Sequence, residues 1–235
     1  SLCEQGRNFC NKIWNCFRLI KGWEVADNEM PATNQWGVEW FKAVLAKTQE
    51  EVADLFSKYR LSEALMAIYK LYCDEFSGWY LEIIKPAYGQ PIDRATYEQT
   101  IQFMDTMLKL LHPFMPFITE ELWQAIEERQ EGESLMVSPL NAEQTLDKAA
   151  QLLENATQCF DIISAIRNIR AQKNISPKEV LTLVAPSELP AVVTKLANVE
   201  LAVGAEKSAG SASFIVGTTE YSVPLEKFIN VDEEL

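Results

Sequence analysis

The chain has 235 residues, of which 48% are hydrophobic and 23% are charged, and 10% are aromatic. This composition excludes a disordered chain, and because no apolar run reaches the roughly 18 residues that a membrane-spanning helix needs, we expect a soluble, cytoplasmic protein. The net charge of −13 opposes general nucleic-acid binding, but residues 1–23 carry +3 and the remainder −16, so a polyanion is expected to approach only the first segment.

The first part of the chain predicts helices, because apolar residues recur at spacings of three and four. A first helix over residues 4–22 is followed by a loop that contains Pro31. Further helices are predicted at 36–59, 61–83, 93–111 and 116–126. Asp93 is the expected N-cap of one of them, and His112 is expected to cap its end. Long helices joined by short loops favour an antiparallel bundle.

The pattern changes near Asn141, and we place a domain boundary between residues 139 and 140. A long helix is predicted over 143–171, and four short stretches rich in β-branched residues follow at 180–185, 199–203, 213–216 and 220–223. The last two flank a hairpin-like turn. The sequence therefore predicts a mainly α fold, with an antiparallel helical bundle over 1–139 and a small α/β module of one long helix plus short strands over 140–235.

The first predicted helix has two different faces. Its core face carries Phe9, Ile13, Cys16, Phe17 and Ile20, whereas at about 100° per residue the opposite side gathers within roughly 60° the residues Arg7, Asn11, Trp14 and Arg18. An indole that lies between two arginines and outside the core is typical of a surface that binds a single-stranded RNA loop. The alternative is that the indole packs against a neighbouring helix and the arginines are ordinary surface charges.

A second cationic cluster lies in the long helix of the second domain. Arg167 and Arg170 are three residues apart, so they share a face, and Lys173 follows one turn later. Both arginines could contact phosphate, and the alternative is again ordinary surface charge.

No catalytic residue and no metal ligand is predicted. The five cysteines are odd in number and never form a C-x-x-C pair, so we interpret them as reduced structural thiols. His112 is the only histidine, and it has no companion at ligand or catalytic spacing. A phosphate-binding glycine loop and a nucleophile elbow are also missing. Because the chain begins with Ser and ends on an acidic stub, we expect a fragment of a longer protein.

Four segments, taken in order, resemble the valyl-tRNA synthetases. They are Gly6–Arg18, Tyr72–Glu82 with Lys85, Leu110–Trp123 and Ile166–Pro177. The first resembles the helix that opens the anticodon-binding bundle of that family, and the last resembles the entry to its small α/β module. A single segment would also be similar to the isoleucyl, leucyl and methionyl enzymes, whereas the first and last together favour the valyl family.

The resemblance implies the anticodon-binding part of an ATP-dependent valine–tRNA ligase, an enzyme of protein biosynthesis. The His-x-Gly-His and Lys-Met-Ser-Lys-Ser signatures of its catalytic domain are absent, and so is the basic coiled-coil arm expected after the small module. ATP and valine are therefore expected to bind in the missing catalytic domain of the same chain, and no cofactor is expected here. We also expect a monomer.

The expected partner is the anticodon stem-loop of tRNA. We predict contact through Arg7, Asn11, Trp14, Asn15 and Arg18, with arginine for phosphate, tryptophan for stacking and asparagine for base or sugar hydrogen bonds. Long-range attraction would come from Lys12 and Lys21, and a minor second contact from Arg167 and Arg170. Two alternatives stay open: the same domain of an isoleucyl enzyme, and a non-enzymatic helical scaffold that binds proteins.

Overall fold

The computed structural model describes residues 2–141, 148–226 and 228. The chain forms two compact units, Ser1–Ala149 and Ala150–Leu235. The sequence analysis placed the boundary between residues 139 and 140, ten residues before the boundary between the units. The residues between these two boundaries include 142–147, which lie outside the described part. Each unit is described by itself below.

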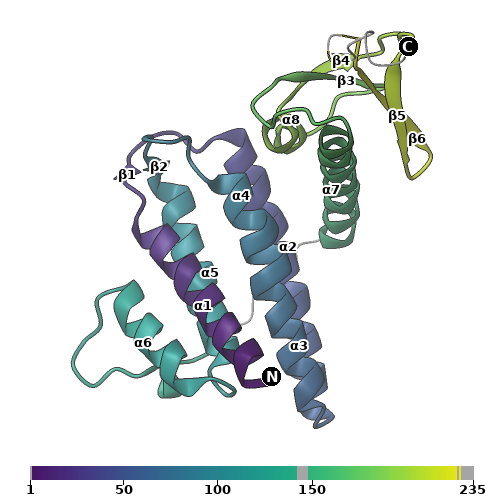
Figure 1. Cartoon of the computed structure of the whole chain (residues 1–235). Coiled ribbons are helices and arrows are strands. Elements are labelled where there is room, and N and C mark those ends of the chain that lie inside the picture. Colours follow the sequence, from purple (N-terminus) through teal and green to yellow (C-terminus); the bar gives the residue numbers. More distant parts are fainter. Residues whose placement is uncertain (1, 142–147, 227, 229–235) are drawn as a thin grey trace. The chain divides into compact units, whose positions relative to one another are not determined.

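The first unit is the predicted helical bundle (Figure 1). Its helices are α1 (Leu2–Lys21), α2 (Ala32–Ser57), α3 (Leu61–Lys70), η1 (Leu71–Tyr80), α4 (Leu81–Ile84), α5 (Arg94–Leu111), α6 (Pro116–Ile126) and the short η2 (Leu135–Val137). Helix α1 and the continuous α3–η1–α4 segment run in one direction, and α2 and α5 run in the other. A two-residue parallel pair, β1 (Val25–Ala26) with β2 (Ile92–Asp93), was not predicted, because two residues carry no strand pattern.

The core of the bundle is built from aromatic rings. Phe41 of α2 lies 4.9 Å from the ring centres of both Tyr80 and Phe103, and 5.3 Å from that of Phe76. All four rings are buried. A Cβ at Gly37 would lie 2.7 Å from the Cγ2 methyl of Ile83, so glycine lets α2 and α4 approach closely. These contacts position η1 and α4 firmly against the bundle.

The predicted helix over 61–83 is formed, but its middle is a π-helix. Hydrogen bonding from i to i+5 requires more than four residues per turn, so residues four apart stay almost in line. Tyr72, Phe76 and Tyr80 have this spacing, and all three are fully buried. The sequence analysis predicted one continuous helix here, because a 3.6-residue periodicity does not distinguish the two helix types over so short a stretch.

Both predicted helix caps are confirmed. The Asp93 carboxylate accepts a hydrogen bond of 2.8 Å from the backbone N–H of Thr96, which satisfies a free donor in the first turn of α5. At the other end, the backbone N–H of His112 donates to the Leu108 carbonyl at 2.9 Å, and its ring nitrogen Nδ1 lies 2.8 Å from Thr119 Oγ1. The histidine therefore joins α5 to α6.

The second unit is the predicted α/β module. It contains α7 (Ala149–Gln172), β3 (Leu181–Ala185), α8 (Ala191–Ala197), β4 (Val199–Val203), β5 (Ser211–Val216) and β6 (Thr219–Pro224). The sheet order is β4-β3-β6-β5, with β3 and β4 parallel and the remaining pairs antiparallel. The predicted start of its long helix falls within residues 142–147, outside the described residues.

One element of this module escaped the sequence analysis. Helix α8 has seven residues and connects the parallel strands β3 and β4, which cannot be joined by a tight turn. It is too short to show a helical repeat, and it ends at Asn198, whose φ of 53° is left-handed. Along the described residues of both units, no helix is long and apolar enough to cross a membrane.

Candidate nucleic-acid interface

Helix α1 presents the two faces that its sequence predicts. Phe9, Ile13, Cys16 and Ile20 are buried, and the Phe9 ring packs 4.9 Å from Tyr69 and 5.7 Å from Tyr72. The opposite side, which we call the α1 outer face, is exposed and consists of Arg7, Asn11, Trp14, Asn15 and Arg18. Lys12 and Lys21 flank it and are exposed as well.

Trp14 lies outside the core. It is 38% exposed, and its ring rests 5.9 Å from that of Phe17 on the same helix. Phe17 was predicted to be inward, and it is only half-buried beside the indole. The aromatic surface is thus held in place while part of it remains open for stacking by an unpaired base, a use that stays a prediction.

The arginines of the α1 outer face are available. Among the residues that the structure describes, no carboxylate forms an ion pair with Arg7, Lys12 or Arg18. Lys21 differs, because its ammonium donates a hydrogen bond of 3.1 Å to the carbonyl of Ile126 at the end of α6. This lysine ties α1 to α6, and it contributes charge to the surface without having all of its donors free.

A groove of about 380 Å³ lies at the C-terminal end of α1, and we call it the terminal groove. The turn Gly22–Glu24 forms one side, and the loop from Lys85 to Gln90 forms the other. Trp23 is half-buried in it, whereas Tyr88 is fully exposed. The sequence analysis did not select this place. The signal that could have identified it is Lys85 directly before a loop that is bounded by Pro86 and Pro91 and carries Tyr88.

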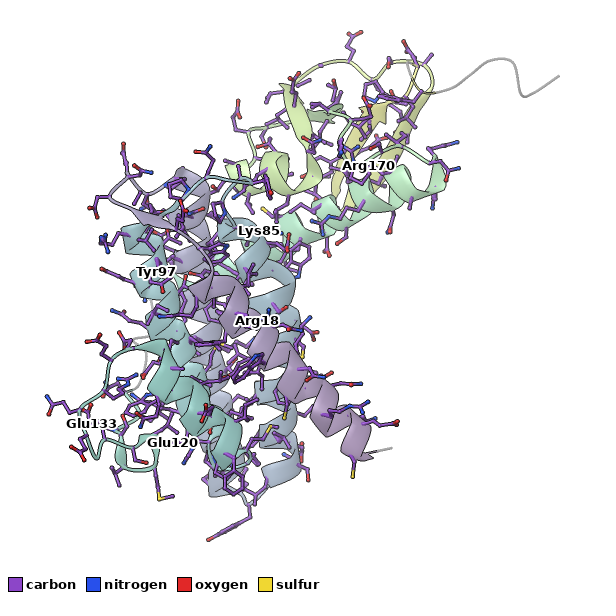
Figure 2. The ribbon with its side chains drawn as sticks, turned by 60° about the vertical axis from the view of Figure 1, so that its left-hand side comes forward. Arg18, Lys85, Tyr97, Glu120, Glu133 and Arg170 are labelled. Atoms are coloured by element: carbon purple, nitrogen blue, oxygen red, sulfur yellow. The ribbon has the colours of Figure 1, made fainter. Side chains whose placement is uncertain are left out.

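A second groove of about 220 Å³ lies beside the first, between α1 and the η1–α4 segment, and we call it the lateral groove. Its α1 wall consists of Lys12, Asn15, Cys16 and Leu19, and its other wall of Ser77, Leu81 and Glu82. The two grooves follow one seam, since the lining residues advance together along α1 and along η1–α4 towards Lys85. Figure 2 labels Arg18 of α1 and Lys85, the residue that directly follows α4.

The second cationic cluster is not formed as predicted. Arg170 is buried, with 5% of its surface exposed, and its guanidinium donates to the carbonyls of Ser176 at 2.9 Å, Ala197 at 3.0 Å and Asn198 at 2.9 Å. Burial lowers the pKa of Arg170, but a guanidinium keeps its proton in proteins. The prediction of a phosphate contact at Arg170 is therefore corrected: this arginine holds the ends of α7 and α8 together.

Arg167 lies on the same helix but stays exposed. Its Nη2 donates to the Leu196 carbonyl at 3.3 Å. Sequence periodicity placed both arginines on one solvent-facing side, but it could not show that the end of α8 lies against that side. Any contact of Arg167 with RNA stays a prediction.

The cysteines and the possible metal ligands of the described residues were also compared with the sequence analysis. Burial raises the pKa of the Cys16 and Cys73 thiols, so both favour the protonated form, which is not nucleophilic. Across residues 2–141, 148–226 and 228, no three His, Cys, Asp or Glu side chains gather to hold a metal ion. What remains is a row of cationic, amide and aromatic groups on an otherwise acidic chain.

Residues 38–185 match a family model described as the anticodon-binding domain of tRNA ligase. The chain is 58% identical over 241 residues to a valine–tRNA ligase of Phocaeicola vulgatus and 55% identical over 241 residues to one of Parabacteroides distasonis. It is 40% identical over 243 residues to one of Christiangramia forsetii. These alignments cover 99–100% of the chain, α1 included, and 27% of each relative's length.

Proposed function

This chain belongs to the family of anticodon-binding domains of tRNA ligases, and we propose that it is the part of a valine–tRNA ligase that holds the anticodon stem-loop. The parent enzyme joins valine to tRNA with ATP, in the cytoplasm, through a catalytic domain outside this chain. ATP is bound there and not here, and the protein acts as a monomer. The role of the present part is to position the tRNA.

The α1 outer face carries this proposal. Arg7 and Arg18 are exposed and have no ion pair among the described residues, and the partly exposed Trp14 lies between them. Guanidinium groups pair with backbone phosphates, and an indole stacks on any unpaired base, so this combination suits the loop of an RNA hairpin. Asn11 and Asn15 on the same face add hydrogen-bonding groups that can reach base edges or ribose hydroxyls.

The charge distribution along the chain supports the same binding surface. Residues 1–23 carry a net +3 while the rest of the chain carries −16. A polyanion is repelled by most of this surface and attracted to one helix, which steers the encounter towards the α1 outer face. An acidic protein can therefore bind RNA specifically at one place and weakly elsewhere.

The test is binding of an anticodon stem-loop RNA from a valine tRNA, measured at several salt concentrations. The affinity should fall as salt rises, and Arg18→Ala should weaken binding roughly five-fold or more and reduce the slope of log affinity against log salt by about one. The matched control is Arg60→Ala, because Arg60 is an exposed arginine of the same unit that pairs with Glu63.

Equal losses in Arg18→Ala and Arg60→Ala would place the contact elsewhere. Absence of RNA binding by the wild-type chain at every salt concentration would overturn the proposal in favour of a protein-binding scaffold.

A further inference from the structure

One end of the helical bundle carries aromatic rings that stand in solvent. In the last turn of α2, the ring of Phe56 lies 5.7 Å from that of Phe114 in the turn between α5 and α6, and both rings are half-buried. Three residues further along each segment, Tyr59 is 89% exposed and Phe117 is 90% exposed. These four rings, which we call the end patch, form one apolar surface from two turns far apart in the sequence.

The backbone at Tyr59 has a conformation that disfavours tyrosine. The amide of Arg60 donates to the Leu55 carbonyl at 2.9 Å, and the amide of Tyr59 donates to the Phe56 carbonyl at 3.0 Å. In a helix end of this type the residue at the place of Tyr59 is left-handed, and glycine is usual there because a side chain strains the backbone. Tyr59 has a φ of 57°. Its ring therefore costs the bundle stability without being buried in it, which indicates a role in binding.

The two cations that flank Tyr59 in the chain are already neutralised by carboxylates. Lys58 forms an ion pair of 2.7 Å with Asp54, and Arg60 forms one with Glu63. RNA binding depends on cations that replace the counterions of the phosphates, and paired cations do this poorly. Aromatic rings with balanced charge around them are typical of the centre of an interface between proteins. The end patch is therefore suited to a protein surface.

The start of α1 lies at the same end of the bundle as the end patch. Helices α1 and α3 run in the same direction (Figure 1), and Phe9 packs 4.9 Å from Tyr69 in the last turn of α3. At about 1.5 Å per residue in both helices, the backbone of Leu2 is level with the first turn of α3. That turn begins at Leu61, two residues after Tyr59.

The length of the relatives points to the occupant of the end patch. The chain spans 27% of the valine–tRNA ligases that it matches, so almost three quarters of such a ligase lies outside it. This remainder continues from the ends of the chain, and whatever precedes α1 arrives beside the end patch. We propose that the end patch is the docking surface for the catalytic part of the ligase, which covers Tyr59 and Phe117. The inference rests on the proposed function only for the identity of this occupant.

Hydroxyl-radical footprinting of the isolated chain and of the full-length ligase tests the docking, because it reports the accessibility of single aromatic rings. In the isolated chain, Tyr59, Phe117 and the fully exposed Tyr88 should all react rapidly. In the full-length ligase without RNA, Tyr59 and Phe117 should react roughly five-fold more slowly, because a protein interface excludes solvent from its centre. Tyr88 is the control and should react equally in both, since it lies in the loop that faces the opposite end of α1.

The substitution Tyr59→Gly separates docking from folding. Because glycine relieves the left-handed backbone, the urea midpoint of the first unit in the isolated chain, followed by tryptophan fluorescence, should not fall. In the full-length ligase the same substitution should lower kcat/KM for the charging of tRNA roughly ten-fold, because a loosely docked bundle positions the tRNA poorly. Valine activation measured without tRNA should not change.

Asn174→Gly is the matched control. Asn174 has a φ of 53° and follows α7 in the same type of helix end, in which the Ile175 amide donates to the Arg170 carbonyl at 2.9 Å and its own amide to that of Ala171 at 3.4 Å. It is exposed and carries no aromatic ring, so charging by the full-length ligase should stay at the wild-type level.

The outcomes identify what covers the end patch. Equal reactivity of Tyr59 in the isolated chain and in the full-length ligase, or unchanged charging in Tyr59→Gly, would overturn the docking proposal. Protection that grows with the concentration of the isolated chain would assign the end patch to a second copy, and protection only after addition of stem-loop RNA would assign it to RNA, and both results overturn the proposal as well. If the rings are protected in the ligase but the chain binds no RNA, the docking stands and the proposed function fails.

Discussion

Helices α1 and α7 each carry an arginine close to the C-terminal end, Arg18 and Arg170, and the two side chains lie in opposite environments. Arg18 on α1 is exposed and has no ion pair within the described residues, whereas Arg170 on α7 is buried against three backbone carbonyls. The difference comes from what lies opposite each helix. Where free backbone carbonyls of neighbouring elements lie close to an arginine, its guanidinium donates hydrogen bonds to them. Where no such carbonyl is near, the guanidinium stays available for a ligand.

The largest expected effect is on the stability of the second unit. Arg170→Ala removes the donor for three carbonyls at once, and we expect the free energy of unfolding to fall by about 3 kcal/mol. Hydrogen exchange of the β3 and β4 amides should report it, because the tryptophans all lie in the first unit. Arg167→Ala is the control, and as an exposed residue it should change stability by about 0.5 kcal/mol or less. Similar losses in both variants would remove the contrast between the two arginines.

A second expectation concerns the inner face of α7. Burial raises the pKa of Cys159 to about 11 from the ordinary 9.0. As the pH rises, the thiol of the unfolded chain therefore loses its proton at a lower pH than the thiol of the folded chain. The native state is then penalised progressively between pH 9 and 11, by about 2 kcal/mol at the upper end. Cys159→Ser should be less sensitive over this range in urea unfolding. An identical pH dependence in the two proteins would contradict the assignment.

A smaller effect is expected on the outer face of α1. Trp14→Ala should weaken binding of the anticodon stem-loop roughly ten-fold, since stacking of one base contributes about 1–3 kcal/mol. The thermal unfolding of the bundle should change little, because the indole lies outside the core. Trp14→Phe should restore much of the affinity. A large loss of stability in Trp14→Ala would instead show that this side chain serves the fold.

The smallest effect is expected for Lys21, whose environment is intermediate between those of Arg18 and Arg170. Lys21 belongs to α1 but donates to the Ile126 carbonyl, as Arg170 does to carbonyls in the other unit. Lys21→Met should therefore lower the stability by about 0.5–1 kcal/mol and reduce the salt slope of RNA binding by less than the Arg18 substitution. Urea unfolding and salt titration of the same variant measure both quantities. A slope change as large as that of Arg18→Ala would assign Lys21 to the RNA surface.

The family assignment and the fold class both followed from the sequence, and both are confirmed. The bundle helices show strong repeats of apolar residues, and the cap at Asp93 is a local signal that needs no tertiary context. The α1 outer face was identified for the same reason, since the buried and exposed sides of an amphipathic helix are set by spacing along one element.

Other features depended on what packs against an element from elsewhere in the chain. The capture of Arg170 requires the carbonyls of Ala197 and Asn198, which are brought to it only by the β3–α8–β4 crossover. The lateral groove requires α1 to lie beside the η1–α4 segment. The terminal groove requires the turn after α1 to face the loop from Lys85 to Gln90.

By itself, the sequence determined which long segments are helical, which side of α1 is apolar, and to which family the chain belongs, because periodicity and motifs are local properties of one stretch of chain. The tertiary structure alone decided which of the described arginines are exposed and where the grooves lie. The physical reason is that the exposure of a charged side chain, and the space in a groove, depend on which other segment packs against a helix. That segment is far away in the sequence.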